Sequence, residues 1–143
     1  MGIEQETFGI GMVGCGTISG THAEAINNLE HGKLVAAFSR NQERVDAFCD
    51  RHGGTGFSDY EAFLSHPDLD VVAICTPTGT HLDYGRQAAR AGKHLIVEKP
   101  VEITLERGQA LIDACRESDV QLAVIYQSRF MDDVVRMKQT IDE

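Results

Sequence analysis

The feature that most restricts the fold is the alternation of short, continuous apolar runs with stretches of helical periodicity. Six runs predict strands, at residues 8–13, 34–38, 55–57, 71–75, 94–97 and 122–125. Strands covered by helices on both faces are apolar at nearly every position, whereas half-exposed strands alternate between apolar and polar residues. Helices between consecutive strands are typical of right-handed crossovers that join parallel neighbours. The chain is therefore predicted to form an α/β fold with a doubly wound, six-stranded parallel sheet.

Residues that favour helix ends locate the helices between these runs. The predicted N-caps are Asn41, Ser58, Thr80 and Thr104. Gly53 and Gly54 would close the helix that Asn41 begins, and Gly92 the helix that Thr80 begins. The positions expected to face the core are Ile18, His22, Ala25, Ile26 and Leu29 in the first helix, Val45, Phe48 and Cys49 in the second, and Leu111, Ile112 and Cys115 in the helix after Thr104.

The six strands and their crossovers would be complete by residue 127, so residues 1–127 are predicted to form one domain. Residues 129–143 carry apolar side chains at helical spacing and predict one further amphipathic helix. These side chains are Phe130, Val134, Met137 and Ile141. A chain of 143 residues matches one domain, which often supplies only one wall of a small-molecule cleft. Part of a larger protein is therefore expected.

Charge and composition exclude several classes of protein. The formal charge is −9 and no basic run follows the chain, which disfavours a nucleic-acid partner. No apolar segment approaches the roughly 18 residues of a membrane span, and the first residues do not resemble a signal peptide. The four cysteines have neither paired spacing nor metal-ligand spacing; they are Cys15, Cys49, Cys75 and Cys115. A cytoplasmic protein with no metal site and with buried, reduced cysteines is expected.

A glycine-rich turn follows the first predicted strand directly. Gly14 permits a tight turn, and Gly16 lets the backbone approach a pyrophosphate held by the first helical amides, at Thr17 and Ile18. The third glycine of the usual G-x-G-x-x-G pattern is replaced by Ser19, which is still small enough for close packing of helix on strand. A purely structural turn remains an alternative. The position of the glycine-rich turn between a strand and a helix favours a dinucleotide-binding Rossmann domain with strand order 3-2-1-4-5-6.

The end of the second strand bears on the choice between NADP and NAD. A carboxylate usually binds the ribose hydroxyls of NAD at this position, about 20 residues beyond the glycines. Here the residues are Ser39 and Arg40, which offer a hydroxyl and a guanidinium to a 2′-phosphate. A preference for NADP over NAD is therefore expected, although Arg40 could also lie on the adenine and tolerate both cofactors.

Two further segments lie where parallel strands end, and ligand crevices form at that edge of an open sheet. Thr76, Pro77 and His81 follow the fourth strand, and Glu98 and Lys99 follow the fifth. Lys99 is the candidate catalytic residue, because its ammonium could hydrogen-bond a substrate hydroxyl or stabilise a carbonyl oxyanion. It could equally be a solvated lysine paired with Glu98. His81 could contact the cofactor, or it could only take part in capping the helix that begins there. His22 is expected to be partly buried rather than catalytic.

These segments together resemble the N-terminal half of the Gfo/Idh/MocA oxidoreductases, the family of glucose-fructose oxidoreductase and inositol dehydrogenase. The resemblance runs from about Phe8 to Ile141. It rests on the glycine turn with Ile18 and His22, on the stretches ICTPTGTH and AARAGKHLIVEKP, and on Arg129-Phe130. The EKP triplet within this combination is much more specific than the glycine turn alone.

The resemblance implies an NAD(P)-dependent dehydrogenase or reductase that moves hydride between nicotinamide and a sugar, cyclitol or related hydroxyl or carbonyl compound. It places Lys99 beside nicotinamide and substrate, and implies that the bond before Pro100 is commonly cis. The residues implied to bind cofactor are Gly14, Gly16, Thr17, Ile18, Ser39, Arg40, Thr76, Pro77, His81, Glu98 and Lys99. The family's larger second domain carries an Asp-x-x-x-His motif, covers the substrate and often mediates oligomerisation. Residues 128–143 would lead toward that domain, which this chain lacks.

The 143 residues are thus expected to bind cofactor without turnover, as half of an enzyme that forms a homo-oligomer. Two other classes stay open at this point. One is a non-catalytic sensor that keeps the dinucleotide site. The other is an S-adenosylmethionine-dependent methyltransferase, which the absence of a carboxylate beside Ser39 disfavours.

Overall fold

The computed structural model describes residues 7–142 and contains one six-stranded, all-parallel sheet. Its strand order, β3-β2-β1-β4-β5-β6, confirms the predicted Rossmann topology. The strands are β1 (Phe8–Val13), β2 (Gly32–Phe38), β3 (Thr55–Phe57), β4 (Val71–Ile74), β5 (His94–Val97) and β6 (Leu122–Val124). Strand β2 begins earlier than predicted, whereas β4 and β6 each end one residue sooner. The first six residues of the predicted domain and Glu143 lie outside the described residues.

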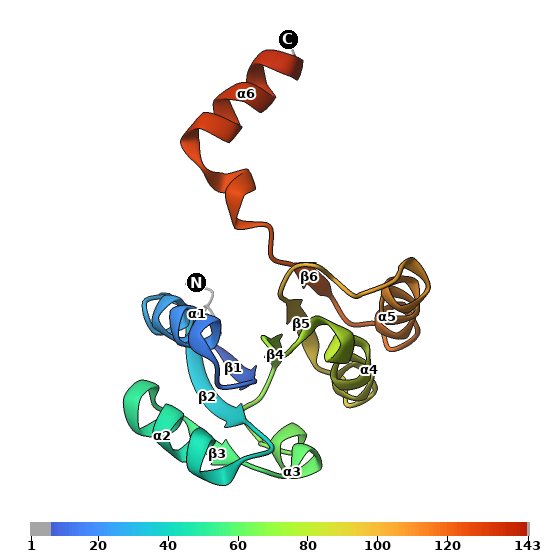
Figure 1. The fold of residues 1–143 in the computed structure, drawn as a ribbon. Coiled ribbons are helices and arrows are strands. Elements are labelled where there is room, and N and C mark those ends of the chain that lie inside the picture. The colour runs from blue at the N-terminus through green and yellow to red at the C-terminus, as the bar shows by residue number, and fades with distance from the viewer. Residues whose placement is uncertain (1–6, 143) are drawn as a thin grey trace, which may run out of the picture.

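Helices cover both faces of this sheet (Figure 1). Ile10 and Met12 of β1 pack with the buried side chains of α1 and α2, while Val13 packs with those of α3, α4 and α5. The helices are α1 (Thr17–Asn27), α2 (Gln42–His52), α3 (Tyr60–Leu64), α4 (His81–Arg90) and α5 (Leu105–Glu117). Burial on both faces is the physical reason why the strands are continuous apolar runs.

The buried face of α1 differs from the predicted stripe. Ser19, Ala23 and Ile26 face the core, whereas Ile18 and Leu29 are 44% and 55% exposed. Small side chains at the start of the helix let it lie close against β1 directly after the glycine turn. The larger Ile18 is consequently left at the sheet edge, beside the turn.

The helix-end predictions are confirmed at four helix ends, and the side-chain caps predicted at two others are not formed. Asn41 and Thr104 cap α2 and α5 through side-chain oxygens that accept from the Arg44 and Arg107 amides at 2.8 and 3.3 Å. Glycines with positive φ follow two helices, as predicted: Gly53 and Gly54 after α2, and Gly92 after α4. Asp59, not Ser58, caps α3: the Asp59 carboxylate accepts from the Ala62 amide at 2.7 Å. Thr80 occupies the predicted N-cap position of α4, but its side chain caps no amide, because its hydroxyl lies within the preceding turn, 2.7 Å from the Pro77 carbonyl oxygen and 2.8 Å from the Thr76 hydroxyl.

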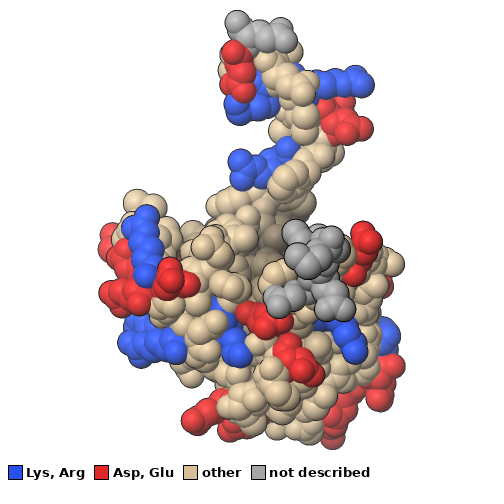
Figure 2. Space-filling model, turned by 180° about the vertical axis from the view of Figure 1, so that it is seen from behind, with Lys and Arg blue, Asp and Glu red and all other residues tan. Residues whose placement is uncertain are grey.

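The C-terminal segment is broken rather than one continuous helix. A 3-10 turn (Gln127–Phe130) precedes α6 (Asp132–Asp142), and α6 extends away from the domain in Figures 1 and 2. Most apolar side chains of this segment are exposed, with Phe130 at 78% and Ile141 at 74%, whereas Val134 is partly buried. Basic and acidic side chains interleave over the face seen in Figure 2. None of the helices in residues 7–142 is long and apolar enough to cross a membrane.

Because α6 buries no residue in this domain, we expect its removal to have little effect on stability. A chain ending at residue 130 should keep its free energy of unfolding within about 1 kcal/mol, as measured by urea denaturation. A chain ending at residue 120, which lacks β6, is the control and should lose cooperative unfolding. A loss above about 2 kcal/mol on removing residues 131–143 would place the domain boundary after α6 rather than at residue 127.

Candidate functional site

The turn between β1 and α1 has the conformation that glycine alone adopts easily. Gly14 has φ +97°, and its amide donates to the Phe38 carbonyl at 2.9 Å. A Cβ at this position would lie 3.0 Å from the Cys75 carbonyl oxygen, so the chain after β4 passes close against the turn. A Cβ at Gly16 would meet nothing within 4 Å. The first glycine therefore makes the turn, and the second keeps an open approach to the backbone.

The N-terminus of α1 can accept an anion. Its first turn contains no acidic residue, and its N-cap residue, Gly16, has no side chain that could accept from the first helical amides. The fully buried Ser19 accepts from the Gly16 amide at 3.3 Å, which holds the turn against the helix. Free amides and the positive end of the helix dipole favour a phosphate group here. The residues present thus fit the pyrophosphate of a dinucleotide.

A hollow of about 130 Å³ lies at the carboxyl ends of β1, β2 and β4. It brings together four of the predicted cofactor residues and five other residues. The predicted ones are Gly14, Ser39, Arg40 and Thr76, and the others are Cys15, Phe38, Arg44, Thr80 and Tyr84. Parallel strands place their ends at one edge, which is why residues far apart in sequence meet here. Ile18, Pro77, Glu98 and Lys99 are not among the residues that line it.

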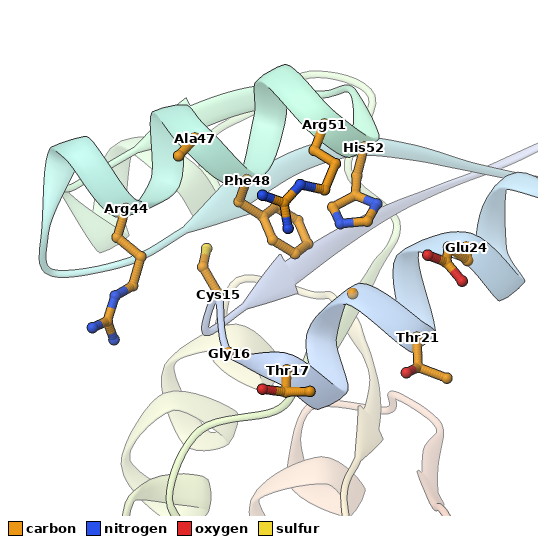
Figure 3. Close-up of a pocket in the computed structure, with 11 residues that line it drawn as sticks. Cys15, Gly16, Thr17, Thr21, Glu24, Arg44, Ala47, Phe48, Arg51 and His52 are labelled. Carbon is orange, nitrogen blue, oxygen red and sulfur yellow. The ribbon is translucent and has the colours of Figure 1, made fainter.

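Arg44 is the cofactor-site candidate that sequence reasoning missed. It lies on α2 and lines both this hollow and a larger groove of about 630 Å³ between α1 and α2. Figure 3 shows Arg44 and Arg51 extending from α2 on the side of that groove, opposite Thr17 and Thr21 of α1. The signal available in the sequence was its spacing: Arg44 is in the first turn after the Asn41 cap, one turn beyond Arg40.

The cysteines at the sheet edge are neutral thiols. Cys15 and Cys75 are half-buried, as is Cys49, so the expectation of fully buried cysteines holds only for Cys115. Burial raises the pKa of the Cys15 and Cys75 thiols to about 12, and the negative charge of Glu98 contributes at Cys75. A thiol with so high a pKa is a poor nucleophile at neutral pH. The turn residues Cys15 and Cys75 are therefore packing groups.

Glu98 pairs with a histidine rather than with the neighbouring lysine. The His22 Nε2 atom lies 2.7 Å from Glu98 Oε1, and both side chains are less than one-fifth exposed. The second oxygen, Oε2, accepts from the Lys99 backbone amide at 3.0 Å. The alternative of a Glu98–Lys99 side-chain pair is therefore not found, because Glu98 binds His22 and the Lys99 backbone amide. Within residues 7–142 the Lys99 ammonium has no salt bridge, and Lys99 is exposed at the end of β5.

His81 is buried beneath the turn that follows β4. It is 1% exposed, with Nε2 2.9 Å from the Thr76 carbonyl oxygen and Nδ1 3.2 Å from that of Val101. Each ring nitrogen thus faces a backbone carbonyl oxygen. Its direct contact with a cofactor stays a prediction, and the geometry favours a supporting role. The Lys99-Pro100 peptide bond is cis, as the resemblance implied.

A second buried acid, Glu102, was not singled out from the sequence. Its oxygens accept from the Leu82 and Ile103 amides at 3.0 and 2.7 Å, and Arg107 Nη2 lies 3.0 Å away. Burial alone would raise the pKa of Glu102, but the hydrogen bonds from Arg107 and the two amides lower it to about 2. The carboxylate is consequently ionised although its side chain is fully buried.

Among residues 7–142 no group of three or more potential metal-ligating His, Cys, Asp or Glu side chains is found. A sequence model of the Gfo/Idh/MocA group, described as an oxidoreductase family with an NAD-binding Rossmann fold, matches residues 8–126. The chain belongs to this family.

Other Gfo/Idh/MocA proteins share both sequence and fold with the chain. Inositol 2-dehydrogenase of Rhizobium meliloti is 31% identical over 137 residues, which cover 96% of this chain and 41% of that protein. The WlbA dehydrogenase of Bordetella pertussis, in complex with NADH and UDP-GlcNAcA, superposes with a TM-score of 0.91 at 31% identity. The 3-ketoreductase KijD10 of Actinomadura kijaniata, in complex with NADP and TDP-benzene, gives 0.89 at 25% identity.

The matched part is the same in each comparison. The alignments cover 96% of this chain but only 42% of WlbA and 44% of KijD10. The chain thus spans about two-fifths of the length of its relatives. The comparisons support a nicotinamide cofactor, and they include proteins crystallised with either NADH or NADP.

Proposed function

We propose that this chain is the cofactor-binding half of an NAD(P)-dependent oxidoreductase that acts on a sugar, a cyclitol or a related hydroxyl or carbonyl compound. The observation that carries the proposal is the hollow where Gly14, Ser39 and Thr76 meet from three strand ends, beside a helix N-terminus whose N-cap residue is a glycine. A dinucleotide spans this edge of a Rossmann sheet. Two relatives support the substrate class: one is named inositol 2-dehydrogenase, and the other is a dehydrogenase whose structure contains UDP-GlcNAcA.

Lys99 is the residue we assign to catalysis. It follows β5, the neighbour of β4, where the nicotinamide end of a cofactor held at β1 and β2 would reach. The bound nicotinamide supplies the hydride chemistry. The ammonium of Lys99, which is exposed and unpaired within residues 7–142, would hydrogen-bond the reacting oxygen of the substrate. One wall of the substrate cleft is present, so binding of cofactor without turnover is expected of the 143 residues.

The cofactor preference proposed is NADP. Ser39 and Arg40 replace the usual carboxylate, and Arg44 adds a second guanidinium to the same hollow. The Ser39 hydroxyl oxygen accepts from the Asn41 amide at 3.3 Å, which leaves its proton to donate outward. Arginine and hydroxyl donors converging on one point suit a phosphate dianion.

We expect NADPH to bind at least about tenfold more tightly than NADH, since a charge-assisted hydrogen bond contributes about 1.4 kcal/mol or more. Arg40→Ala and Arg44→Ala should each remove most of this preference, because each deletes a cation beside the 2′-phosphate. Arg90→Ala, which alters an exposed arginine at the end of α4, is the matched control. Fluorescence titration with both nucleotides gives the dissociation constants. Tighter binding of NADH, unaffected by Arg40→Ala, would refute the NADP assignment.

A further inference from the structure

Two segments that flank the candidate site are tied together by a network of buried polar groups. One is the turn at residues 76–80 after β4, and the other is the segment at residues 98–103 after β5. Neither belongs to a long regular element, so main-chain bonding within helices and strands does not fix their separation. Beyond the backbone hydrogen bond from the Glu98 amide to the Ile74 carbonyl oxygen, side chains that bridge the two segments hold them together.

The first bridge is His81, whose two ring nitrogens face the Thr76 and Val101 carbonyl oxygens. The second is the pair of Glu102 and Arg107. Glu102 Oε1 accepts from the Leu82 amide at the start of α4, and Oε2 accepts from the Ile103 amide of its own segment. Arg107 Nη2 lies 3.0 Å from both the Glu102 carboxylate and the Gly79 carbonyl oxygen. One guanidinium thus joins α5 to both segments.

The chemistry of this pair is more demanding than packing alone requires. The Glu102 side chain is 0% exposed, and Arg107 Nε is buried without a hydrogen-bond partner within residues 7–142. A buried ion pair contributes little net stability compared with apolar residues of the same size. It does fix the relative orientation of the groups that it joins, because a guanidinium offers its donors in a rigid plane. The pair is therefore suited to hold the two segments at a defined distance and orientation.

We propose that Glu102 and Arg107 are positioning residues that set the distance between the turn at residues 76–80 and the Lys99 segment, and so shape the nicotinamide side of the cofactor site. This inference rests on the proposed function. The pair of Glu102 and Arg107 affects only the nicotinamide side of the site. The residues assigned to the adenosine phosphate follow β2 and form no hydrogen bond to the pair; they are Ser39, Arg40 and Arg44.

The test compares Arg107→Met with wild type in the 143-residue chain, with two ligands. NADPH should bind about tenfold more weakly to Arg107→Met, a change equivalent to about 1.4 kcal/mol. The adenosine half alone, 2′,5′-ADP, should bind within about twofold of wild type, since its contacts are not tied by Arg107. Arg116→Met, which alters a 74% exposed arginine of the same helix, is the control for both ligands.

The local effect is measured without any ligand by amide hydrogen exchange. Residues 78–80 should exchange faster in Arg107→Met, while Met12 and Val13 in β1 keep their protection. The double variant Glu102→Gln with Arg107→Met removes both charges and avoids an unpaired buried carboxylate. It should melt closer to wild type than Arg107→Met does, yet bind NADPH equally weakly.

Three results would overturn the inference: unchanged NADPH binding by a folded Arg107→Met, equal weakening of both ligands, or a double variant that binds NADPH as wild type does. Failure of the wild-type chain to bind NADPH would instead refute the proposed function. Hydrogen exchange then still decides whether Arg107 ties the two segments, because unchanged exchange at residues 78–80 contradicts the bridge directly.

Discussion

Gly14→Val is expected to abolish cofactor binding, raising the dissociation constant for NADPH at least about a hundredfold, or about 2.8 kcal/mol. A β-branched residue is an outlier at the φ of +97° that Gly14 adopts. Its Cβ would also lie 3.0 Å from the Cys75 carbonyl oxygen and 3.2 Å from the Thr76 side chain. The turn would have to move away from β4, and the amides of α1 would move with it. Fluorescence titration measures the loss.

Gly92→Val is the matched control for this experiment. Gly92 has φ +74° at the end of α4, and a Cβ there would meet nothing within 4 Å. Both variants should lose about 1–2 kcal/mol of stability from the strained backbone. Only Gly14→Val should lose NADPH. If the two variants bind NADPH alike, the turn after β1 is a structural turn and not a pyrophosphate site.

Glu102→Gln is expected to lower the free energy of unfolding at pH 7 by about 2 kcal/mol, because the one-third-exposed Arg107 loses its nearer carboxylate partner and keeps only Asp83 at 3.4 Å. The pKa of Glu102 falls from 4.5 to about 2 on folding. A lowered pKa stabilises the folded state above pH 4.5, and the stabilisation disappears as the pH falls toward 2. The wild-type advantage over Glu102→Gln should therefore shrink through that window.

Thermal melts of both proteins between pH 7 and pH 3 test this sign. Glu117→Gln, an exposed change at the end of α5, should melt as wild type does at every pH. A difference between wild type and Glu102→Gln that stays constant from pH 7 to pH 3 would show that Glu102 is not held ionised by its partners.

Local sequence signals were sufficient at most places where the deciding contacts are local. The glycine turn, the Asn41 and Thr104 caps and the six strand positions were predicted correctly. The caps expected of Ser58 and Thr80 failed locally, because Asp59 caps α3 and the Thr80 hydroxyl lies within its own turn. Other predictions failed where a distant partner decides. Ile18 was expected inside, but the close approach of α1 to β1 selects Ser19 and Ala23 for the buried face.

The polar network of the site shows the same limit more clearly. Glu98 binds His22, 76 positions away, rather than its neighbour Lys99, and Arg107 reaches Gly79 across 28 positions. No periodicity marks such pairs, since each depends on how strands β4 and β5 lie side by side. Arg44 was missed for a different reason: its position four residues after Arg40 was visible in the sequence but was not used.

The central claim is that the strand ends of β1, β2 and β4 form a nicotinamide dinucleotide site. Amide chemical-shift mapping of the 143-residue chain during an NADPH titration tests it most directly. The account predicts saturable shifts at Gly14, Gly16 and Ile18 in the turn, at Ser39 and Arg40 after β2, and at Thr76 and Lys99 beyond them. Absence of saturable shifts, or shifts confined to α5 and β6, would contradict it.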